Sequence, residues 1–187
     1  MTGATCPGVR AGIHEGEFDV GLLLESEERG DSTGTSARAI TGLPASDRVV
    51  VANDLPLVIF GGPLHPLVHH RERALVRRDE LAAYPLFMSD AAGDFHVLVR
   101  HFFESDDLPG PHLEVAGSVE GVKRGVATDS QALGILPAYA VVEELQDKRL
   151  AALSVRPKPP SMRLEALLSL VRPRHPAAAE LLEFLGP

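Results

Sequence analysis

The sequence predicts an α/β protein in which strands and helices alternate along one chain. Short runs that are almost wholly apolar, such as Phe18–Glu25 and Pro85–Ser89, are typical of strands buried on both faces. Between such runs, segments like Phe95–Ser105 space apolar residues three and four positions apart, as an amphipathic helix does. This alternation favours a mostly parallel sheet with helices on both faces.

The first part of the chain predicts strands separated by one long loop. Phe18–Glu25 forms the first strand, and Ser26–Asp47, rich in Gly, Ser, Thr and charge, predicts a loop. The segments 48–53 and 55–60 are two strands, or one strand that bends near residues 53 and 54. The glycines and prolines of GGPLHPLVHHRER argue against regular structure in residues 61–73.

The middle of the chain predicts a short helical segment, a buried strand and an amphipathic helix. Arg77–Tyr84 suits one or two helical turns, and Pro85–Ser89 suits a strand. In Phe95–Ser105 the apolar stripe has the helical spacing i, i+3, i+4, i+7, i+8 and consists of Phe95, Leu98, Val99, Phe102 and Phe103.

The last part of the chain continues the alternation. Ser118–Thr128 predicts a helix with Ser118 as its N-cap and Val119, Val122 and Val126 facing inward. The other predicted elements are strands over His112–Gly117, Ala132–Pro137, Arg149–Val155 and Met162–Val171, and helices over Ala138–Lys148 and His175–Gly186.

The composition indicates a globular chain. Of 187 residues, 44% are hydrophobic and 24% charged, which is close to the globular average. The net charge of −8 makes the chain a poor partner for DNA phosphates. Cys6 is the only cysteine, so no intramolecular disulfide can form. Without a signal-peptide pattern or an apolar run of membrane-spanning length, we expect a cytoplasmic protein with no membrane partner.

The chain shows no motif of a known catalytic site. It has no G-x-S-x-G, P-loop, H-E-x-x-H or C-x-x-C pattern, and no evident base lies near Cys6 in the sequence. We therefore expect no catalytic residues and no cofactor, and hence no enzyme. His65, His69 and His70 lie close together, but adjacent histidines point apart in regular backbone. We interpret them as a solvated turn and expect no metal site.

A more informative feature is the segment Ser89–Gly93, where a buried strand passes through a turn of small residues into a helix. Open α/β sheets bind ligands beyond the carboxyl ends of their strands, where free amides of a first helical turn favour an anion. The segment Val115–Val119 repeats this arrangement. The alternative is ordinary helix capping by Ser118 and Asp94, which the pattern alone favours.

Five stretches, in order from about Gly12 to Leu185, resemble the effector-binding domain of LysR-type transcriptional regulators. GIHEGEFDVGLLLE resembles that domain's G-x-x-D-aliphatic strand entry, and LVIFGGPLHPL its strand with an HPL turn. RRDELAAYPLFMS, VEGVKRGVATDSQALGILPAYAVVEEL and the closing SVRPKP…LEALLSLVRPRHPAAAELLEFL resemble its later segments. The chain departs from the family in the residues Asp129-Ser130-Gln131 before the LP strand and in the length of the loop over Ser26–Asp47.

The resemblance implies a type 2 periplasmic-binding-protein-like α/β fold, with two Rossmann-like lobes joined by a hinge. Lobe one would comprise residues 1–58 and 153–187, and lobe two residues 59–152. The domain's opening strand, helix and strand have no counterpart in this sequence, so we expect lobe one to be incomplete. Nothing resembles the winged helix-turn-helix either, and the chain is similar to an N-terminally truncated regulator.

The function that the resemblance implies is ligand sensing: the domain would bind a small-molecule effector in an interlobe cleft and so control transcription. The alternatives are a stand-alone solute-binding protein of the same fold, or a small enzyme on this scaffold, for which no nucleophile and base are evident. The expected partners are the effector, a second copy in a homo-oligomer, and DNA only through a winged helix-turn-helix absent from this chain.

The residues that the resemblance places at the effector are Leu24, Glu25, Ser89, Asp90, Gly93, Asp94, Phe95, Ser118 and Val119. Ser89, Ser118 and the amides of residues 93 and 94 would hydrogen-bond a polar group of the ligand. Leu24 and Phe95 would form apolar walls. The three acids in this set would repel an anion, so a cationic or neutral effector remains an alternative.

Overall fold

The computed structural model describes residues 6–26, 48–69, 75–91, 93–104, 110–169, 171 and 175–185. The chain forms two compact units. Unit 1 consists of Met1–Leu55, Ala92–Phe95 and Ser161–Pro187, and unit 2 of Pro56–Ala91 and His96–Pro160.

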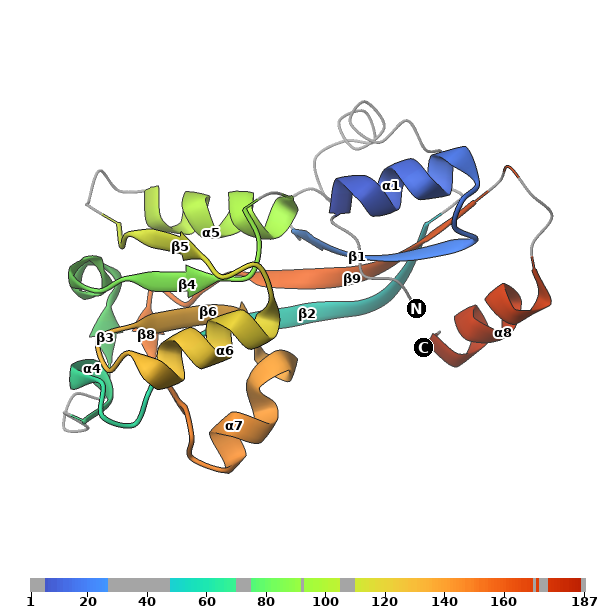
Figure 1. Ribbon diagram of the computed structural model, residues 1–187. Coiled ribbons are helices and arrows are strands. Elements are labelled where there is room, and N and C mark those ends of the chain that lie inside the picture. Colours follow the sequence, from blue (N-terminus) through green and yellow to red (C-terminus); the bar gives the residue numbers. More distant parts are fainter. Residues whose placement is uncertain are drawn as a thin grey trace. The chain divides into compact units, whose positions relative to one another are not determined.

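Unit 1 is built on the strands β1 (Val20–Ser26), β9 (Ser161–Leu168) and the first part of β2 (Arg48–Gly61), with β9 in the middle. β1 and β9 pair antiparallel along the whole of β1, from Val20 opposite Leu168 to Ser26 opposite Met162. The helix α1 (Cys6–Glu15) lies over these two strands (Figure 1). A further helix, α8, spans Pro176–Leu185.

The close approach of α1 to β1 depends on a glycine in the strand. A Cβ atom at Gly21 would lie 2.4 Å from Cγ1 of Val9 in α1, so a larger residue would push the helix away. The gap is closed by a small core of Ile13, Leu23 and Leu167, with Val9 and Phe18 packed against it. α1 is followed by Gly16, whose φ of 73° is the left-handed conformation that commonly follows a helix.

Unit 2 has a sheet in the order β2, β6, β4, β5, with β7 on the other side of β2. β6 is antiparallel to β2, whereas β4 pairs parallel with both β6 and β5. A separate pair of short parallel strands joins β3 to β8. The strands are β3 (Val76–Arg77), β4 (Leu86–Met88), β5 (Leu113–Val115), β6 (Leu133–Pro137), β7 (Ala151–Ala152) and β8 (Val155–Arg156).

The helical segments of unit 2 follow its sheet strands. They are α4 (Pro66–His69), the 3₁₀ helix η2 (Arg78–Ala83), α5 (Asp94–Glu104, whose first two residues belong to unit 1), α6 (Val119–Thr128), η3 (Ala138–Val141) and α7 (Val142–Gln146). α6 packs against β6 and β4. All five residues of the predicted stripe in α5 are buried, which confirms its amphipathic face.

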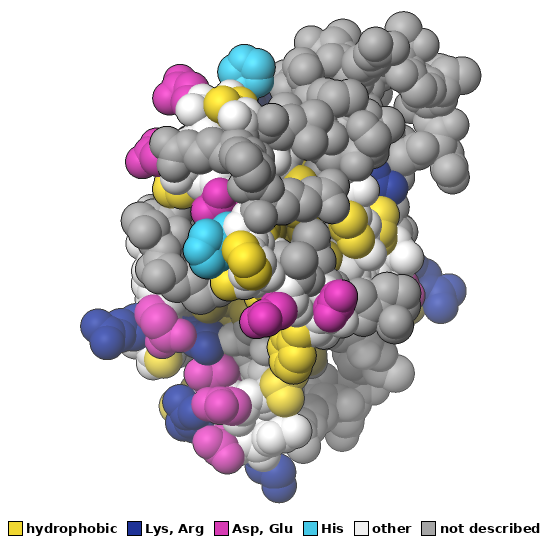
Figure 2. All heavy atoms as spheres, turned by 90° about the vertical axis from the view of Figure 1, so that its right-hand side faces the viewer, with side chains coloured by type: hydrophobic (Ala, Val, Ile, Leu, Met, Phe, Trp, Pro, Cys, Tyr) yellow, Lys and Arg dark blue, Asp and Glu magenta, His cyan; other side chains and the backbone are white. Residues whose placement is uncertain are grey.

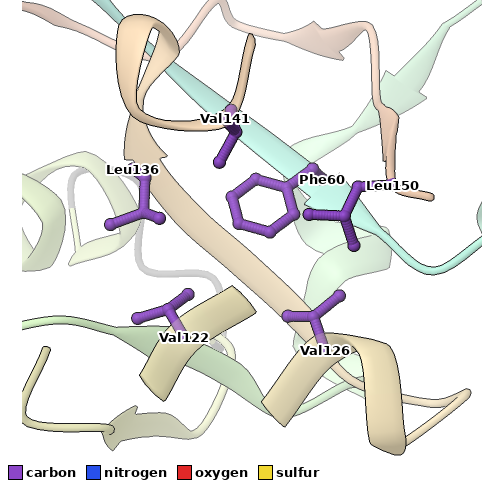
Figure 3. Close-up of a cluster of buried hydrophobic side chains, with 6 residues drawn as sticks. All are labelled: Phe60, Val122, Val126, Leu136, Val141 and Leu150. Carbon is purple, nitrogen blue, oxygen red and sulfur yellow. The ribbon is translucent and has the colours of Figure 1, made fainter. Parts of the chain in front are cut away.

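The core of unit 2 is a cluster of six buried side chains, drawn in Figure 3. Phe60 of β2 lies at its centre, and Val122 and Val126 point up to it from α6. Leu136, Val141 and Leu150 complete the cluster. One apolar contact region therefore holds together helix α6, strands β2 and β6, and the segment after α7.

The structure corrects several predictions about strands. The sheet is mixed rather than mostly parallel, because β1 pairs antiparallel with β9, and β2 pairs antiparallel with β6 and β7. β1 pairs with β9 alone among the described strands, and only alternate residues of it are fully buried, because α1 covers one face. The predicted strand Arg149–Val155 is divided between β7 and β8, which pair with different partners.

Other predictions concern the division of residues 48–60, a turn and a helix face. Residues 48–61 form one continuous strand rather than two, with Asp54 at a φ of 50°. The prediction that residues 61–73 lack regular structure is wrong for residues 66–69, which form the short helix α4. Pro66 begins this helix, as proline can at a first helical position. Val119 was expected to face inward, but it is 37% exposed because it lies in the first turn, beyond the edge of the core. Residues 27–47 of the predicted loop lie outside the described part.

Candidate functional site

Unit 1 contains a buried cluster of three charged side chains. Arg10 reaches from α1 to Glu25 near the end of β1, where its guanidinium Nη2 donates a hydrogen bond to Oε1 of Glu25. The same Nη2 lies 3.6 Å from Oδ2 of Asp94, the first residue of α5. Glu25 is only 4% exposed. One guanidinium thus faces two carboxyl groups in a place with little water.

Burial and a hydrogen bond with Asp94 together raise the pKa of Glu25 to about 8, although the charge of Arg10 lowers it. A hydrogen bond between two carboxyl groups requires that one of them hold a proton. Nη1 of Arg10 is also buried and has no hydrogen-bond partner among the described residues. The cluster can therefore exchange a proton near neutral pH and still has one donor to offer.

A second buried acid lies further along the same strands. Glu165 of β9 is 3% exposed and is flanked by two guanidinium groups. Nε of Arg163 lies 2.7 Å from its Oε1, and Nη1 of Arg48 lies 3.4 Å from its Oε2. Arg163 is directly opposite Glu25 in the β1–β9 register. Glu165 thus has two arginines beside it, whereas the described contacts of Glu25 include one.

In unit 2 the polar candidates gather at the carboxyl ends of the parallel strands. Ser89 and Asp90 follow β4 and are half-buried. Gly117 and Ser118 follow β5, which pairs with β4, and a Cβ at Gly117 would meet nothing within 4 Å. These positions form the edge at which open α/β sheets bind ligands.

Ser118 acts as the N-cap of α6. Its Oγ accepts a hydrogen bond of 3.0 Å from the amide of Gly121, and its backbone is extended, as in helix caps generally. The capping role therefore occupies one lone pair of the hydroxyl. Because the side chain is exposed, its O–H remains able to donate.

The structure brings some of the predicted site residues together within a unit and separates others. In unit 1, Glu25 and Asp94 are in contact, and Gly93 precedes Asp94 with a φ of 93°. Leu24 is half-buried on the opposite face of β1 from Glu25, and Phe95 is 8% exposed, so Phe95 belongs to the packed interior. In unit 2, Ser89, Asp90, Ser118 and Val119 share one sheet edge.

Two residues that sequence reasoning missed belong to these regions. Arg10 was overlooked, although a glutamate inside the apolar run Phe18–Glu25 needs a cationic partner once it is buried. Tyr139 follows β6, the third parallel strand, and exposes 58% of its surface at the same edge as Ser89. An aromatic residue two positions after the strand-ending Leu136-Pro137 pair was the signal available for it.

The histidine prediction was wrong for one residue. His65 is fully buried, with Nε2 3.2 Å from the carbonyl oxygen of Gln131 and its ring centroid 4.5 Å from that of Tyr84. Its Nδ1 accepts a hydrogen bond from the amide of Leu67, and burial lowers the pKa of the ring. The reason is that Gly61 leaves room for the ring to fold back onto β2. His69 is exposed as predicted, and His70 lies outside the described residues.

Within the described ranges, no three His, Cys, Asp or Glu side chains are arranged to hold a metal ion. No helix in that part of the chain combines the length and the apolar character needed to cross a membrane. Figure 2 shows one face, on which described Asp and Glu side chains lie among Lys, Arg and apolar ones.

A protein-family model described as the LysR substrate binding domain matches residues 2–187. A comparison with curated protein sequences finds no match. Among solved structures, the regulatory domain of CcmR from Synechocystis, in complex with 2-PG, has a TM-score of 0.70 and 17% identity, with 95% of this chain and 76% of that one covered.

Two further structures are similar. The effector-binding domain of QuiR in complex with shikimate has a TM-score of 0.66 and 17% identity, covering 98% of this chain and 77% of that one. Full-length OxyR from Pseudomonas aeruginosa has a TM-score of 0.65 and 16% identity, covering 96% of this chain and 56% of that one. At such identities these structures share the fold with this chain, and this chain spans little more than half of the full-length protein.

Proposed function

The chain belongs to the LysR substrate-binding domain family, and from that premise we propose that its polar clusters are the parts that recognise an effector. It is a ligand-sensing domain with the type 2 periplasmic-binding-protein-like α/β fold. The family consists of transcriptional regulators. Ligand sensing is therefore favoured over the alternative function, that of a stand-alone solute-binding protein. We propose that the chain itself has no catalytic activity.

The observation that carries this proposal is the cluster of Arg10, Glu25 and Asp94. Buried charged groups that lack full compensation cost folding free energy and are often retained for binding. Two carboxyl groups facing one guanidinium favour a ligand group that donates hydrogen bonds, such as a hydroxyl or an ammonium. A cationic group there would favour the ionised form of Glu25 and release its proton.

Ser89, Asp90, Ser118 and Val119, at the strand ends of unit 2, are the second set of proposed effector residues. The hydroxyl of Ser89 and the amides near Gly117 suit a polar ligand group, because α6 begins at this edge and the first amides of a helix have no partner within the helix. In the same proposal, the lobes comprise residues 1–58 with 153–187, and 59–152. The division of the chain into two compact units supports this.

The partners follow from the family and are proposed with it. We expect a cytoplasmic regulator that forms homo-oligomers and contacts DNA through a separate winged helix-turn-helix domain. The greater length of full-length OxyR supports the view that such a domain lies outside the part matched here. The chain alone, with net charge −8, should show no specific affinity for DNA.

The test is a thermal-shift screen of the chain with small hydroxylated acids and amines, including shikimate and 2-PG, followed by calorimetry on the best ligand. Ser89→Ala should weaken binding about fivefold or more, since one hydrogen bond to a ligand is lost. Ser154→Ala is the matched control, because Ser154 is exposed elsewhere in unit 2. Equal affinities of the two variants, or no ligand from either chemical class, would refute the proposed site.

A further inference from the structure

Unit 2 contains an open hollow of about 720 Å³ that belongs to none of the regions described above. Its walls come from the turn before α4, from α4 itself, from the end of α7 and from β7. The lining residues are Pro63, Val68, His69, Leu145, Lys148, Leu150, Ala151 and Ala152. A volume of this size falls within the range of about 300–1,000 Å³ typical of sites for small organic ligands.

The floor of the hollow is apolar and part of the packed interior. Leu150 is 3% exposed and belongs to the core cluster around Phe60, and Val68 is 8% exposed. Leu145 and Ala151 are half-buried beside them. A hydrophobic ligand body seated here would cover side chains already held rigidly by the core, so binding would order little that is mobile.

The rim carries a cation without a partner. Lys148 is exposed, and its ammonium group forms no ion pair with any described residue. It lies two residues after the end of α7 with a φ of 59°, a left-handed conformation unusual for lysine, and its amide donates to the carbonyl of Leu145. The neighbouring Arg149 is instead paired with Asp147 and Glu144.

The charge of the described lining is opposite to that of the chain. No aspartate or glutamate is among the described residues that line the hollow, although the chain as a whole has a net charge of −8. From the apolar floor and the unpaired Lys148 we propose that this hollow binds a small organic anion with a flat or branched apolar body, at a site separate from the effector residues. The carboxylate, sulfonate or phosphate of such a ligand would pair with Lys148 while its apolar body covers Val68 and Leu150.

The experiment uses naphthalene-2-sulfonate as probe and follows the backbone amides of the whole chain by NMR. Saturable shifts should occur at residues 145–152 and near 68. The cationic counterpart 2-naphthylmethylammonium should bind about tenfold more weakly, because it meets the ammonium of Lys148. Shifts confined to Ser89 and Ser118, or equal affinity of the two probes, would overturn the proposal.

Two variants, each with a control variant, separate the effect of the charge of Lys148 from the effect of the shape of the hollow. Lys148→Asn keeps a residue that tolerates positive φ, and it should remove the preference for the sulfonate. Lys158→Asn, at an exposed lysine outside the hollow, should leave it unchanged. Ala152→Phe should abolish probe binding by filling the hollow, whereas Glu25→Gln should not alter it. Retained preference in Lys148→Asn would contradict the assignment.

Discussion

Gly134 of β6 lies directly opposite Phe60 of β2, and the phenyl ring of Phe60 occupies the space that a side chain at position 134 would need. A Cβ atom at Gly134 would lie 2.6 Å from Cζ of Phe60, closer than packed carbon atoms come. The ring can therefore lie at the centre of the unit 2 core only because residue 134 is a glycine (Figure 3).

Gly134→Ala should accordingly destabilise the chain by about 1–3 kcal/mol, the usual cost of overpacking a core. Urea denaturation measures the change in the free energy of unfolding. The double variant Gly134→Ala with Phe60→Leu should lose less than the sum of the two single variants, because the shorter side chain relieves the clash. Gly62→Ala is the control, since its Cβ would make only an ordinary contact of 3.4 Å. Additive losses would show that the ring does not clash.

Glu25 should make the chain less stable as pH rises from about 5 to about 8. Its pKa in the folded chain is raised to about 8, so over this interval the unfolded chain loses the proton while the folded chain keeps it. Glu25→Gln, which mimics the protonated form, should flatten this part of the stability profile. Glu17→Gln, at an exposed position, should keep the wild-type slope. A profile of Glu25→Gln parallel to wild type would count against a protonated Glu25.

The two neighbours of Glu25 should shift its pKa in opposite directions. Asp94→Asn removes the acid whose hydrogen bond and charge raise the pKa of Glu25, so the pKa should fall. Arg10→Met removes the cation that lowers it, so the pKa should rise. Carboxyl carbon NMR titration of Glu25 reads out both shifts. Arg10→Met should also cost about 2 kcal/mol of stability, since a buried charged hydrogen bond is lost.

His65 should limit stability on the acid side. Burial lowers its pKa in the folded chain, so as pH falls below the ordinary histidine range the unfolded chain takes up the proton first, and stability is lost. His65→Gln should cost about 1–2 kcal/mol at pH 7 through lost hydrogen bonds, yet show a shallower decline between pH 7 and 5. His69→Gln, exposed in the same segment, should decline as wild type does.

Ser118 allows capping and ligand binding to be separated. Ser118→Ala should cost about 1 kcal/mol of stability, because α6 loses its N-cap. Ser118→Asp restores a capping acceptor and should recover that stability, but it removes the hydroxyl donor. If Ser118 also contacts the effector, Ser118→Asp binds it more weakly than wild type while unfolding at the same urea concentration. If Ser118→Asp binds the effector with full affinity, Ser118 acts only as the N-cap of α6.

The sequence by itself determined the elements whose signal is local. The stripe from Phe95 to Phe103 predicted the buried face of α5, and the position of Ser118 predicted a cap, because helix period and capping depend on residues within a few positions of one another. The apolar runs that became β4 and β6 were likewise found at nearly their observed bounds.

Only the tertiary structure decided how distant segments meet. The pairing of Arg10 with Glu25 and Asp94, the burial of His65 against Gln131 and the antiparallel placement of β1 beside β9 join residues far apart in the sequence. Local patterns state that a segment is apolar or that a charge needs a partner, but not which segment supplies the partner. That choice depends on which backbones can approach closely, as Gly21 and Gly134 permit here, and it is made by packing.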